Sequence, residues 1–341
     1  MQASILFGNG LDLGYGLQTS YSNFYDYLIH LENQDEKLSK NMIFQKLKED
    51  YGTDRLEYWK DYEVKLGALT QDFDDIEKFD EDKMEIDLYL EKFLSDENSK
   101  LNNIDINSKD LLNKIIPLIG QCQREEDQVI LQKLLDNQGS GHIYLKPVSF
   151  NYTDTVNKIF DIKEPNAINA HILNIPTSGY NMYLNKPFYL HGTLGDDMVI
   201  GINDANQILN SKWSENEEAC DVLLKTRLLS QSGQQHMKKY KEIINSSSLI
   251  CCYGLSIGET DKEYWIEIKQ RLLKGDCLLL IYVHDNSLPF NHIRSKTKLR
   301  DKYKESFYKN SECTDEEREL LKNKIIIEVN HDIFSIEYAN L

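Results

Sequence analysis

Short apolar runs alternate with amphipathic stretches along much of the chain. The first run is SILFG at residues 4–8, and six more strand-like segments follow, at residues 142–150, 188–194, 198–204, 247–256, 277–285 and 324–330. Stretches with helical spacing, at residues 216–229 and 262–275, separate several of them. Such alternation is typical of a mostly parallel sheet with helices on both faces. The pattern therefore predicts an α/β, Rossmann-like fold.

A long polar region interrupts this alternation. Residues 20–32 have helical spacing, with Tyr21, Phe24 and Leu28 on one face, and residues 33–138 continue in a helical pattern with few strand signals. We therefore expect a helical insertion at residues 25–142 and a Rossmann-like domain formed by residues 1–24 and 143–341.

Charge supports this division. The chain has 341 residues and a formal net charge of −17. Residues 25–142 hold 28 acids and 15 bases, a net charge of −13, and the remainder has a net charge of −4. An acidic surface repels phosphate backbones, so we do not expect a general nucleic-acid-binding protein.

The composition also excludes several other classes. No apolar run reaches 18 residues, and the start MQASILFGNG lacks a basic region and a cleavage site, so neither a transmembrane helix nor a secretory signal is predicted. The six cysteines form no C-x-x-C pair, which argues against a structural zinc site. We expect a cytoplasmic protein with reduced thiols.

Glycines follow the first predicted strand in the segment LFGNGLDLGYG. Gly8 and Gly10 let the backbone approach a ligand, and such turns often bind phosphate through their N–H groups. The segment is neither G-x-G-x-x-G followed directly by a helix nor a Walker motif with its lysine. A tight strand-to-helix turn without a ligand explains it equally well.

Polar residues end three further predicted strands. Asn151 and Asp154 in SFNYTDT fit a helix cap at least as well as a binding site. His191 in FYLHGTL is a candidate acid or base, or a histidine satisfied by a backbone partner. Ser256 and Asp261 follow the run LICCYG and fit a turn and a cap. Carboxyl ends of parallel strands meet at one edge of a sheet, so all four segments predict one crevice.

These motifs together resemble a known family. ILFGNGLDLGYGLQTSYSNF, WKDYE, FNYTDT, LHGTL with IGIND, and YGLSIGETDKEYW are similar to the bacterial AbiH family of phage abortive infection. The resemblance extends from the first strand to about residue 270. It implies a role in anti-phage defence.

A more distant resemblance is to sirtuin-like NAD-binding domains, whose motifs occur in the same order. Thr153 stands where their N-[IFY]-D motif has aspartate, and the paired-cysteine zinc module is missing. The resemblance therefore does not extend to protein deacylation. It implies an effector that binds NAD, or a related nucleotide, and hydrolyses its N-glycosidic bond without a metal.

Roles for individual residues follow from motif position. The resemblance implies that His191 accepts a proton and that Asn151 orients the attacking water. Gly8, Asn9 and Gly10 hold the diphosphate, Asp12 a ribose hydroxyl, and Ser256 a phosphate or ribose. Further nucleotide contacts are implied for Thr19, Tyr21, Asp154, Gly254 and Asp261.

Two other functions stay open. The crevice could instead be a non-catalytic sensor for a nucleotide or a phage-derived trigger, with the insertion supporting homo-oligomers or other partners. The run IRSKTKLRDKYK at residues 293–304 could grip RNA in a toxin, although a solvated helix is the simpler interpretation. In WKDYE, Trp59 and Tyr62 are expected to pack the insertion on the core. Glu63 is either a surface charge or a residue that reaches the crevice, and no catalytic role is assigned to it.

Overall fold

The computed structural model forms two compact units. Unit 1 comprises Met1–Gly16, Asn103–Leu190 and Met237–Leu341, and unit 2 comprises Leu17–Asn102 and His191–His236. The structure describes residues 1–51, 62–119, 121–137, 142–161, 171–174, 181–231, 235–285, 287–288, 292–331 and 333–334.

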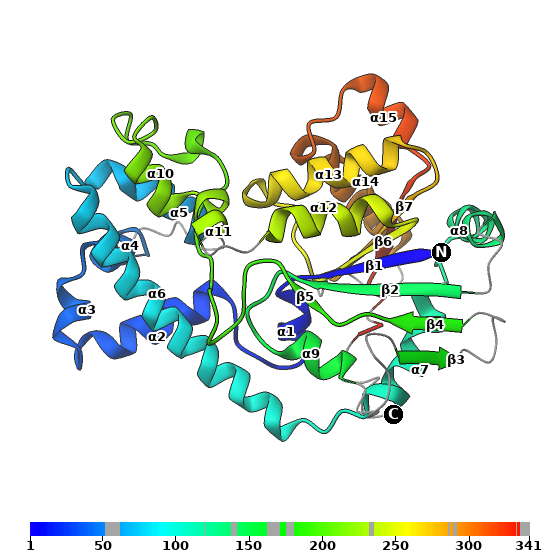
Figure 1. Cartoon of the computed structure of the whole chain (residues 1–341), viewed down its shortest axis with the longest axis horizontal. Coiled ribbons are helices and arrows are strands. Elements are labelled where there is room, and N and C mark those ends of the chain that lie inside the picture. Colours follow the sequence, from blue (N-terminus) through cyan, green and yellow to red (C-terminus); the bar gives the residue numbers. More distant parts are fainter. Residues whose placement is uncertain are drawn as a thin grey trace. The chain divides into compact units, whose positions relative to one another are not determined.

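Unit 1 is built on a mostly parallel sheet (Figure 1). Its strands are β1 (Gln2–Phe7), β2 (His142–Ser149), β3 (His171–Asn174), β4 (Asn181–Leu184), β5 (Phe188–Tyr189), β6 (Leu249–Tyr253), β7 (Leu278–Val283) and β8 (Ile325–Val329). The order is β3-β4-β2-β1-β6-β7-β8, and β5 also pairs with β2. All neighbouring strands are parallel except β3 and β4.

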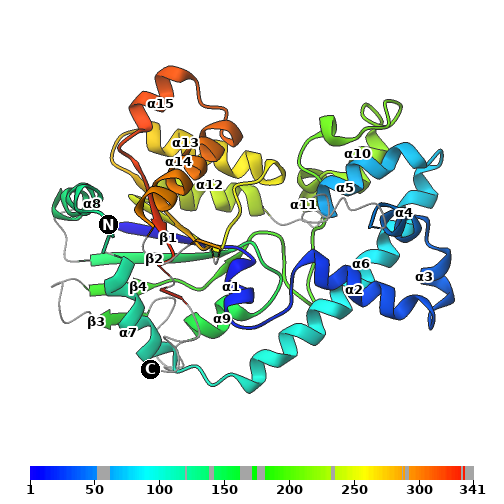
Figure 2. The ribbon, with the colours of Figure 1, turned by 180° about the vertical axis from the view of Figure 1, so that it is seen from behind.

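Helices cover both faces of this sheet. The helices of unit 1 are α1 (Gly10–Gly14), α7 (Ser108–Ile119), α8 (Glu125–Asn137), α9 (Thr155–Phe160), α12 (His236–Ser246), α13 (Lys262–Leu273), α14 (Ile293–Asn310) and α15 (Asp315–Leu321). Alternate residues of β1 point to opposite faces, so Ile5 and Phe7 pack with α7, α8 and α9. Leu6 packs on the other face with residues of α12, α13 and α14. Figure 2 shows these three helices together on that face of the sheet. The predicted Rossmann-like α/β fold is confirmed.

The chain changes direction within the sheet at β1. From β1 it passes to β2 and then to β4 and β5 on one side, and β6, β7 and β8 extend from the opposite side of β1. β4 and β5 both pair with β2, at successive parts of its length, so together they occupy one position in the sheet. β1 and β6 therefore flank a topological switch point, beside which open α/β sheets bind ligands.

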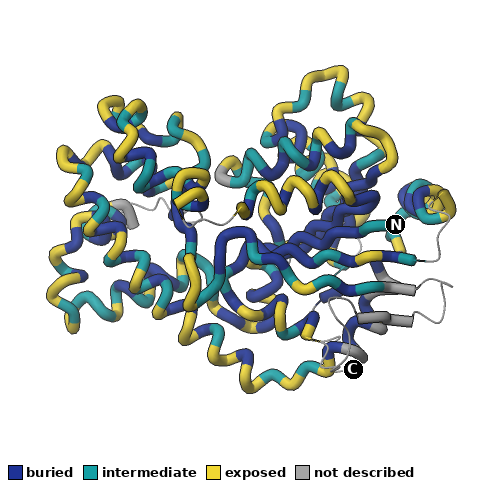
Figure 3. Tube along the Cα trace, in the orientation of Figure 1, coloured by how far each residue is buried: buried dark blue, intermediate teal, exposed yellow. Residues whose placement is uncertain are grey.

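Burial follows this architecture. The strands β1, β6, β7 and β8 are buried along almost their whole length, as Figure 3 shows. Cys251 and Cys252 lie on adjacent positions of β6 and are fully buried with free thiols. Burial raises the pKa of both thiols, which keeps them protonated and unreactive. None of the helices in the described part of the chain is long and apolar enough to cross a bilayer.

Unit 2 is helical. It contains α2 (Tyr21–Glu32), α3 (Glu36–Lys40), α4 (Met42–Tyr51), α5 (Tyr62–Leu69), α6 (Ile76–Ser99), α10 (Glu217–Leu223) and α11 (Lys225–Gln231). Side-chain oxygens of Ser20, Asp35 and Asp75 accept hydrogen bonds from backbone N–H groups at the starts of α2, α3 and α6. Aromatic rings of Phe24 and Phe93 pack in its core, 5.6 Å apart between centroids.

The two units differ from the predicted boundaries at 24/25 and 142/143. Residues 103–137 belong with the sheet, because α7 and α8 bury Leu112 and Leu131 in its core. Residues 191–236 belong with the helices instead. This division concentrates the charge further: unit 2 has 29 acids and 14 bases, whereas unit 1 has 27 acids and 25 bases.

The strand predicted at residues 198–204 is wrong. Only Ile202 makes a β-bridge there, with Leu224. The amide of Lys225 donates to the carbonyl oxygen of Ile202 (2.8 Å), and this backbone pairing separates α10 from α11 within the helix expected at residues 216–229.

Candidate functional site

The turns that follow β1 and β6 are joined through their backbones. The amide of Gly8 donates to the carbonyl oxygen of Tyr253 (3.0 Å), and that of Gly10 donates to the carbonyl oxygen of Gly254 (2.8 Å). A Cβ on Gly8 would lie 2.6 Å from the Gly254 oxygen, so a larger residue does not fit. The absence of side chains at these two glycines therefore allows the turns after β1 and β6 to lie in direct backbone contact.

Gly254, in the turn after β6, must also be glycine. Its φ is +63°, and a Cβ would lie 2.6 Å from the amide nitrogen of Leu11. The amides of Gly8 and Gly10, which were predicted to hold a diphosphate, thus donate within the protein. Asn9, between them, is exposed. Any phosphate at this turn has to be bound by donors other than those two amides.

Asp12 lies buried directly behind the glycine turn. The side chain of Thr153 donates a hydrogen bond from Oγ1 to Asp12 Oδ2 (2.7 Å), and Thr155 Oγ1 lies 3.4 Å from Thr153 Oγ1. Burial raises the pKa of Asp12 to about 6, and the polar side chains of Thr155, Thr153 and Asn151 partly offset that rise. Asp12 Oδ1 is also buried and accepts no hydrogen bond from any described residue.

Asn151 connects the end of β2 to the same turn. Its Nδ2 donates to the carbonyl oxygen of Gly8 (3.0 Å), and its backbone amide donates to Ser149 Oγ (3.1 Å). Only 7% of Asn151 is exposed. The ends of β1, β2 and β6 therefore converge, as the sequence predicted, and Asp12, Asn151 and Gly254 lie at one edge of the sheet.

The other predicted residues of unit 1 are more exposed. Asp154 occupies the N-cap position of α9 but makes no side-chain cap hydrogen bond, and it accepts instead from Asn157 Nδ2 (3.2 Å). Ser256 is exposed after β6. Asp261, which is half-buried, ends a 3-10 turn before α13 and likewise makes no side-chain cap bond.

Three predicted site residues belong to unit 2: His191, Thr19 and Tyr21. β5 ends at Tyr189, so His191 follows the strand by two residues and is buried with 4% exposure. Its carbonyl oxygen accepts from the amide of Val199 (2.9 Å) and closes the 191–199 loop. Because His191 and Asn151 belong to different units, their joint action stays a prediction.

Glycine shapes the 191–199 loop. Gly192 has φ +82°, and a Cβ there would overlap the carbonyl oxygen of Asp197. The glycine of the H-G pair, His191-Gly192, is thus required by the conformation of the loop itself, independently of any ligand.

A buried ion pair in unit 2 was missed from the sequence. Lys225 Nζ lies 2.7 Å from Glu63 Oε2, and the two side chains are 2% and 10% exposed. The interpretation of Glu63 as a surface charge is therefore wrong. Lys225 stands between leucines in VLLKTRLL, which was the available signal. Trp59 and Asp61 of the WKDYE motif lie outside the described residues.

The basic run at residues 293–304 forms the first part of α14. Two of its basic side chains donate hydrogen bonds to other residues of the protein. Arg300 donates from Nε to the carbonyl oxygen of Ile327 (3.1 Å) and from Nη2 to Gln123 Oε1 (3.0 Å). Lys304 Nζ donates to the carbonyl oxygen of Lys322 (3.3 Å). The exposed bases that remain, Arg294, Lys298 and Lys302, are spaced four residues apart on one stripe.

The motifs gathered in both units lie within one family match. A family model described as bacteriophage abortive infection AbiH matches residues 5–283, which is well over half of the chain. No similar curated protein was found. The matched range includes the glycine turn after β1, the ends of β2 and β6, the 191–199 loop and the Glu63–Lys225 pair. The chain belongs to the AbiH family of bacteriophage abortive infection proteins.

Proposed function

We propose that this protein is an abortive-infection effector that binds NAD or a related nucleotide at the carboxyl ends of β1, β2 and β6. We further propose that it hydrolyses the N-glycosidic bond of that nucleotide. Family membership supports the anti-phage role.

The observation that carries the nucleotide proposal is the switch point between β1 and β6. With β4 and β5 taken as one position and the antiparallel β3 set aside, the parallel strands have the 3-2-1-4-5-6 order of dinucleotide-binding sheets. Those sheets bind dinucleotides at the carboxyl edge beside the first strand. In this chain the glycine turns at Gly8–Gly10 and at Gly254 occupy that place.

Asp12 Oδ1, which has no hydrogen-bond partner among the described residues, fits a ribose hydroxyl. A hydroxyl that donates to Oδ1 would supply the hydrogen bond this buried atom lacks, and an acidic residue that holds ribose is common in dinucleotide sites. Asp12 is 1% exposed, so this contact requires the short α1 turn to move outward. That movement would break backbone hydrogen bonds of the turn, such as the one from Gly10 to Gly254, so the free energy of nucleotide binding would have to offset this cost.

The proposed chemistry needs orientation more than acid catalysis. Loss of nicotinamide from NAD places oxocarbenium character on the ribose, and the cationic leaving group departs neutral. Asn151 would orient the ribose or the attacking water, and His191 would accept the proton that the water releases. Water adds to the ribose carbon, the C–N bond to nicotinamide breaks, and ADP-ribose, nicotinamide and a proton result.

A specific observation favours a second candidate, a nucleotide sensor without turnover. Asn151 Nδ2 and the amides of Gly8 and Gly10 already donate hydrogen bonds within unit 1, so these groups hold strand ends together. A ligand that rearranged those bonds would change the conformation of the turns. Binding without product would support this candidate.

Incubation of the full chain with NAD, NADP and ATP, followed by chromatography of the products, separates the two candidates. The proposed reaction releases nicotinamide with wild type and with the exposed control variant Ser99→Ala. His191→Ala and Asn151→Ala are expected to reduce the rate at least about hundredfold. Absence of product with wild type, or equal rates in all variants, contradicts hydrolysis.

A further inference from the structure

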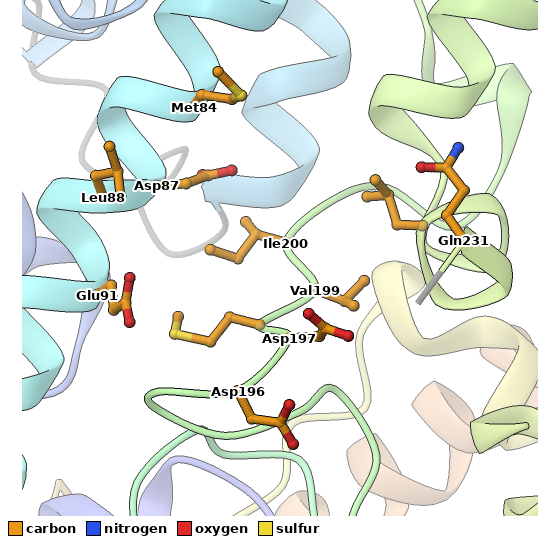
Figure 4. Close-up of a pocket in the computed structure, with 11 residues that line it drawn as sticks. Met84, Asp87, Leu88, Glu91, Asp196, Asp197, Val199, Ile200 and Gln231 are labelled. Atoms are coloured by element: carbon orange, nitrogen blue, oxygen red, sulfur yellow. The ribbon is translucent and has the colours of Figure 1, made fainter. Parts of the chain in front are cut away.

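Unit 2 contains a groove formed by its own residues alone. It has a volume of about 680 Å³ and is formed by α6, the loop at residues 196–200 and α11. Figure 4 shows the carboxylates of Asp87, Glu91, Asp196 and Asp197 around it. Part of its wall is thus the 191–199 loop that carries the H-G pair.

Negative charge dominates the lining. Among the described residues, those that line the groove include four carboxylates and no Lys or Arg. Lys83 pairs with one of them, with Nζ 2.6 Å from Asp87 Oδ2, but Asp87 Oδ1 is buried without a hydrogen bond from the described residues. Burial raises the pKa of Asp87, and Lys83 opposes the rise. An additional cationic donor would satisfy this oxygen.

Apolar side chains complete the groove. Met84 and Leu88 are 57% and 65% exposed on successive turns of α6, and Val199 and Ile200 are buried in the facing loop. Adjacent exposed apolar residues beside carboxylates form an amphipathic surface. Its complement is an apolar residue flanked by bases, as in helices that dock in grooves.

The start of α14 presents that complement in the same chain. Ile293 is 80% exposed, the highest exposure among the large apolar residues in the described ranges. Arg294, the next residue, and Lys298, one turn after Arg294, are exposed, and the first turn of α14 contains no acid. In a chain of net charge −17, this tip is a local concentration of positive charge.

We infer that the groove of unit 2 binds the α14 tip of a second copy of this chain. Ile293 packs between Met84 and Leu88, and the bases of the tip meet the carboxylates of the groove. The contact is heterologous, since the two surfaces differ, so each copy has one groove and one tip to offer. Association is therefore expected to continue beyond pairs, and to weaken with salt.

Sedimentation velocity of the full chain tests this directly. Wild type is expected to associate as its concentration rises. It should dissociate when salt is raised from about 50 to about 500 mM, because this change shortens the electrostatic screening length about threefold. The groove variant Glu91→Lys with Asp197→Lys, and the tip variant Arg294→Glu with Ile293→Asp, should each weaken association at least about tenfold.

Mixing the two variants distinguishes this contact from any symmetric one. The groove variant keeps its tip, and the tip variant keeps its groove, so a mixture retains one intact contact. It should form pairs of one chain of each kind and nothing larger. Neither variant alone should form such pairs.

Matched charge reversals far from the contact serve as controls. Asp96→Lys on α6, about 140° around the helix from Glu91, and Lys309→Glu at the end of α14 change exposed residues of the same helices and should leave association unchanged. Circular dichroism confirms that all variants are folded. A monomeric wild type, association that persists in both variants, or a mixture that stays monomeric overturns the inference.

Discussion

The two units hold their family motifs together by different means. In unit 1 the motifs follow the ends of parallel strands, and backbone hydrogen bonds between glycine turns join them. Asp12 is buried beside these turns, and burial raises its pKa to about 6. In unit 2 the motifs lie in helices and loops, and a buried Glu63–Lys225 pair links α5 to α11. Family motifs therefore mark structural joints as well as possible chemistry. In unit 1 the acceptor Asp12 Oδ1 receives no hydrogen bond from the part of the chain that the structure describes, whereas the charges of the Glu63–Lys225 pair neutralise each other.

The largest expected effect concerns the ion pair in unit 2. Lys225→Met leaves the Glu63 carboxylate buried without its ammonium partner, and it should lower the free energy of unfolding by about 3–5 kcal/mol. Urea denaturation measures the loss. Adding Glu63→Leu should restore at least half of it, because the uncompensated charge is then removed.

An exposed pair provides the control for this first prediction. Lys40 and Glu36 form an ion pair 2.6 Å apart whose side chains are 72% and 81% exposed. Lys40→Met should therefore cost well under about 1 kcal/mol. Equal losses for the buried and the exposed pair contradict the structural role given to Lys225.

The second prediction concerns the pH dependence of Asp12. Its folded pKa of about 6 exceeds the ordinary value of 3.8, so the folded state binds the additional proton between these pH values. The free energy of unfolding should therefore fall by about 3 kcal/mol in total as pH rises from about 3 to about 7, with about 2 kcal/mol of the fall between about pH 4 and 6, and then level off. Asp12→Asn should lack this fall. If the free energies of unfolding of wild type and Asp12→Asn vary with pH in parallel, Asp12 is not a buried carboxyl with a raised pKa.

A third prediction tests the backbone joint of unit 1. Gly254→Ala introduces a Cβ at φ +63°, 2.6 Å from the Leu11 nitrogen, and should destabilise the protein by about 2–3 kcal/mol. Gly14→Ala is the matched control, because no atom lies within 4 Å of its added Cβ. The midpoint of thermal unfolding should fall for Gly254→Ala and stay unchanged for Gly14→Ala. Similar falls in both variants would contradict the close backbone contact at Gly254.

The smallest effect is expected at Thr153. Thr153→Val removes the hydrogen bond to Asp12 Oδ2 and should cost about 1–2 kcal/mol at neutral pH. It should also raise the pKa of Asp12 further, because the hydroxyl no longer stabilises the carboxylate. Unfolding across pH detects this as an upward shift of the Asp12 transition. An unshifted transition contradicts the contact.

Much of the sheet could be predicted because its strands have strong local signals. The continuous apolar runs of β1, β6, β7 and β8 match buried parallel strands, and their order along the chain indicates a doubly wound sheet. Residues 198–204 were misassigned because an apolar run cannot distinguish a strand from a buried loop. Packing alone places α7 and α8 with the sheet.

The candidate site was predictable where topology brings strand ends together. Asn151, Gly8 and Gly254 follow neighbouring parallel strands, so their convergence follows from strand order. The burial of Asp12 and its bond to Thr153 depend on tertiary packing that no local pattern encodes. The pairing of Glu63 with Lys225, 162 residues apart, has the same origin.

Calorimetric titration of NAD into the purified full chain tests the central claim, that the strand-end site of unit 1 binds a nucleotide. Saturable binding is expected for wild type and for the groove variant Glu91→Lys with Asp197→Lys. Asn151→Ala should bind at least about tenfold more weakly, since it loses the bond that shapes the glycine turn. Absence of binding to NAD, or equal affinity in wild type and Asn151→Ala, would contradict the account.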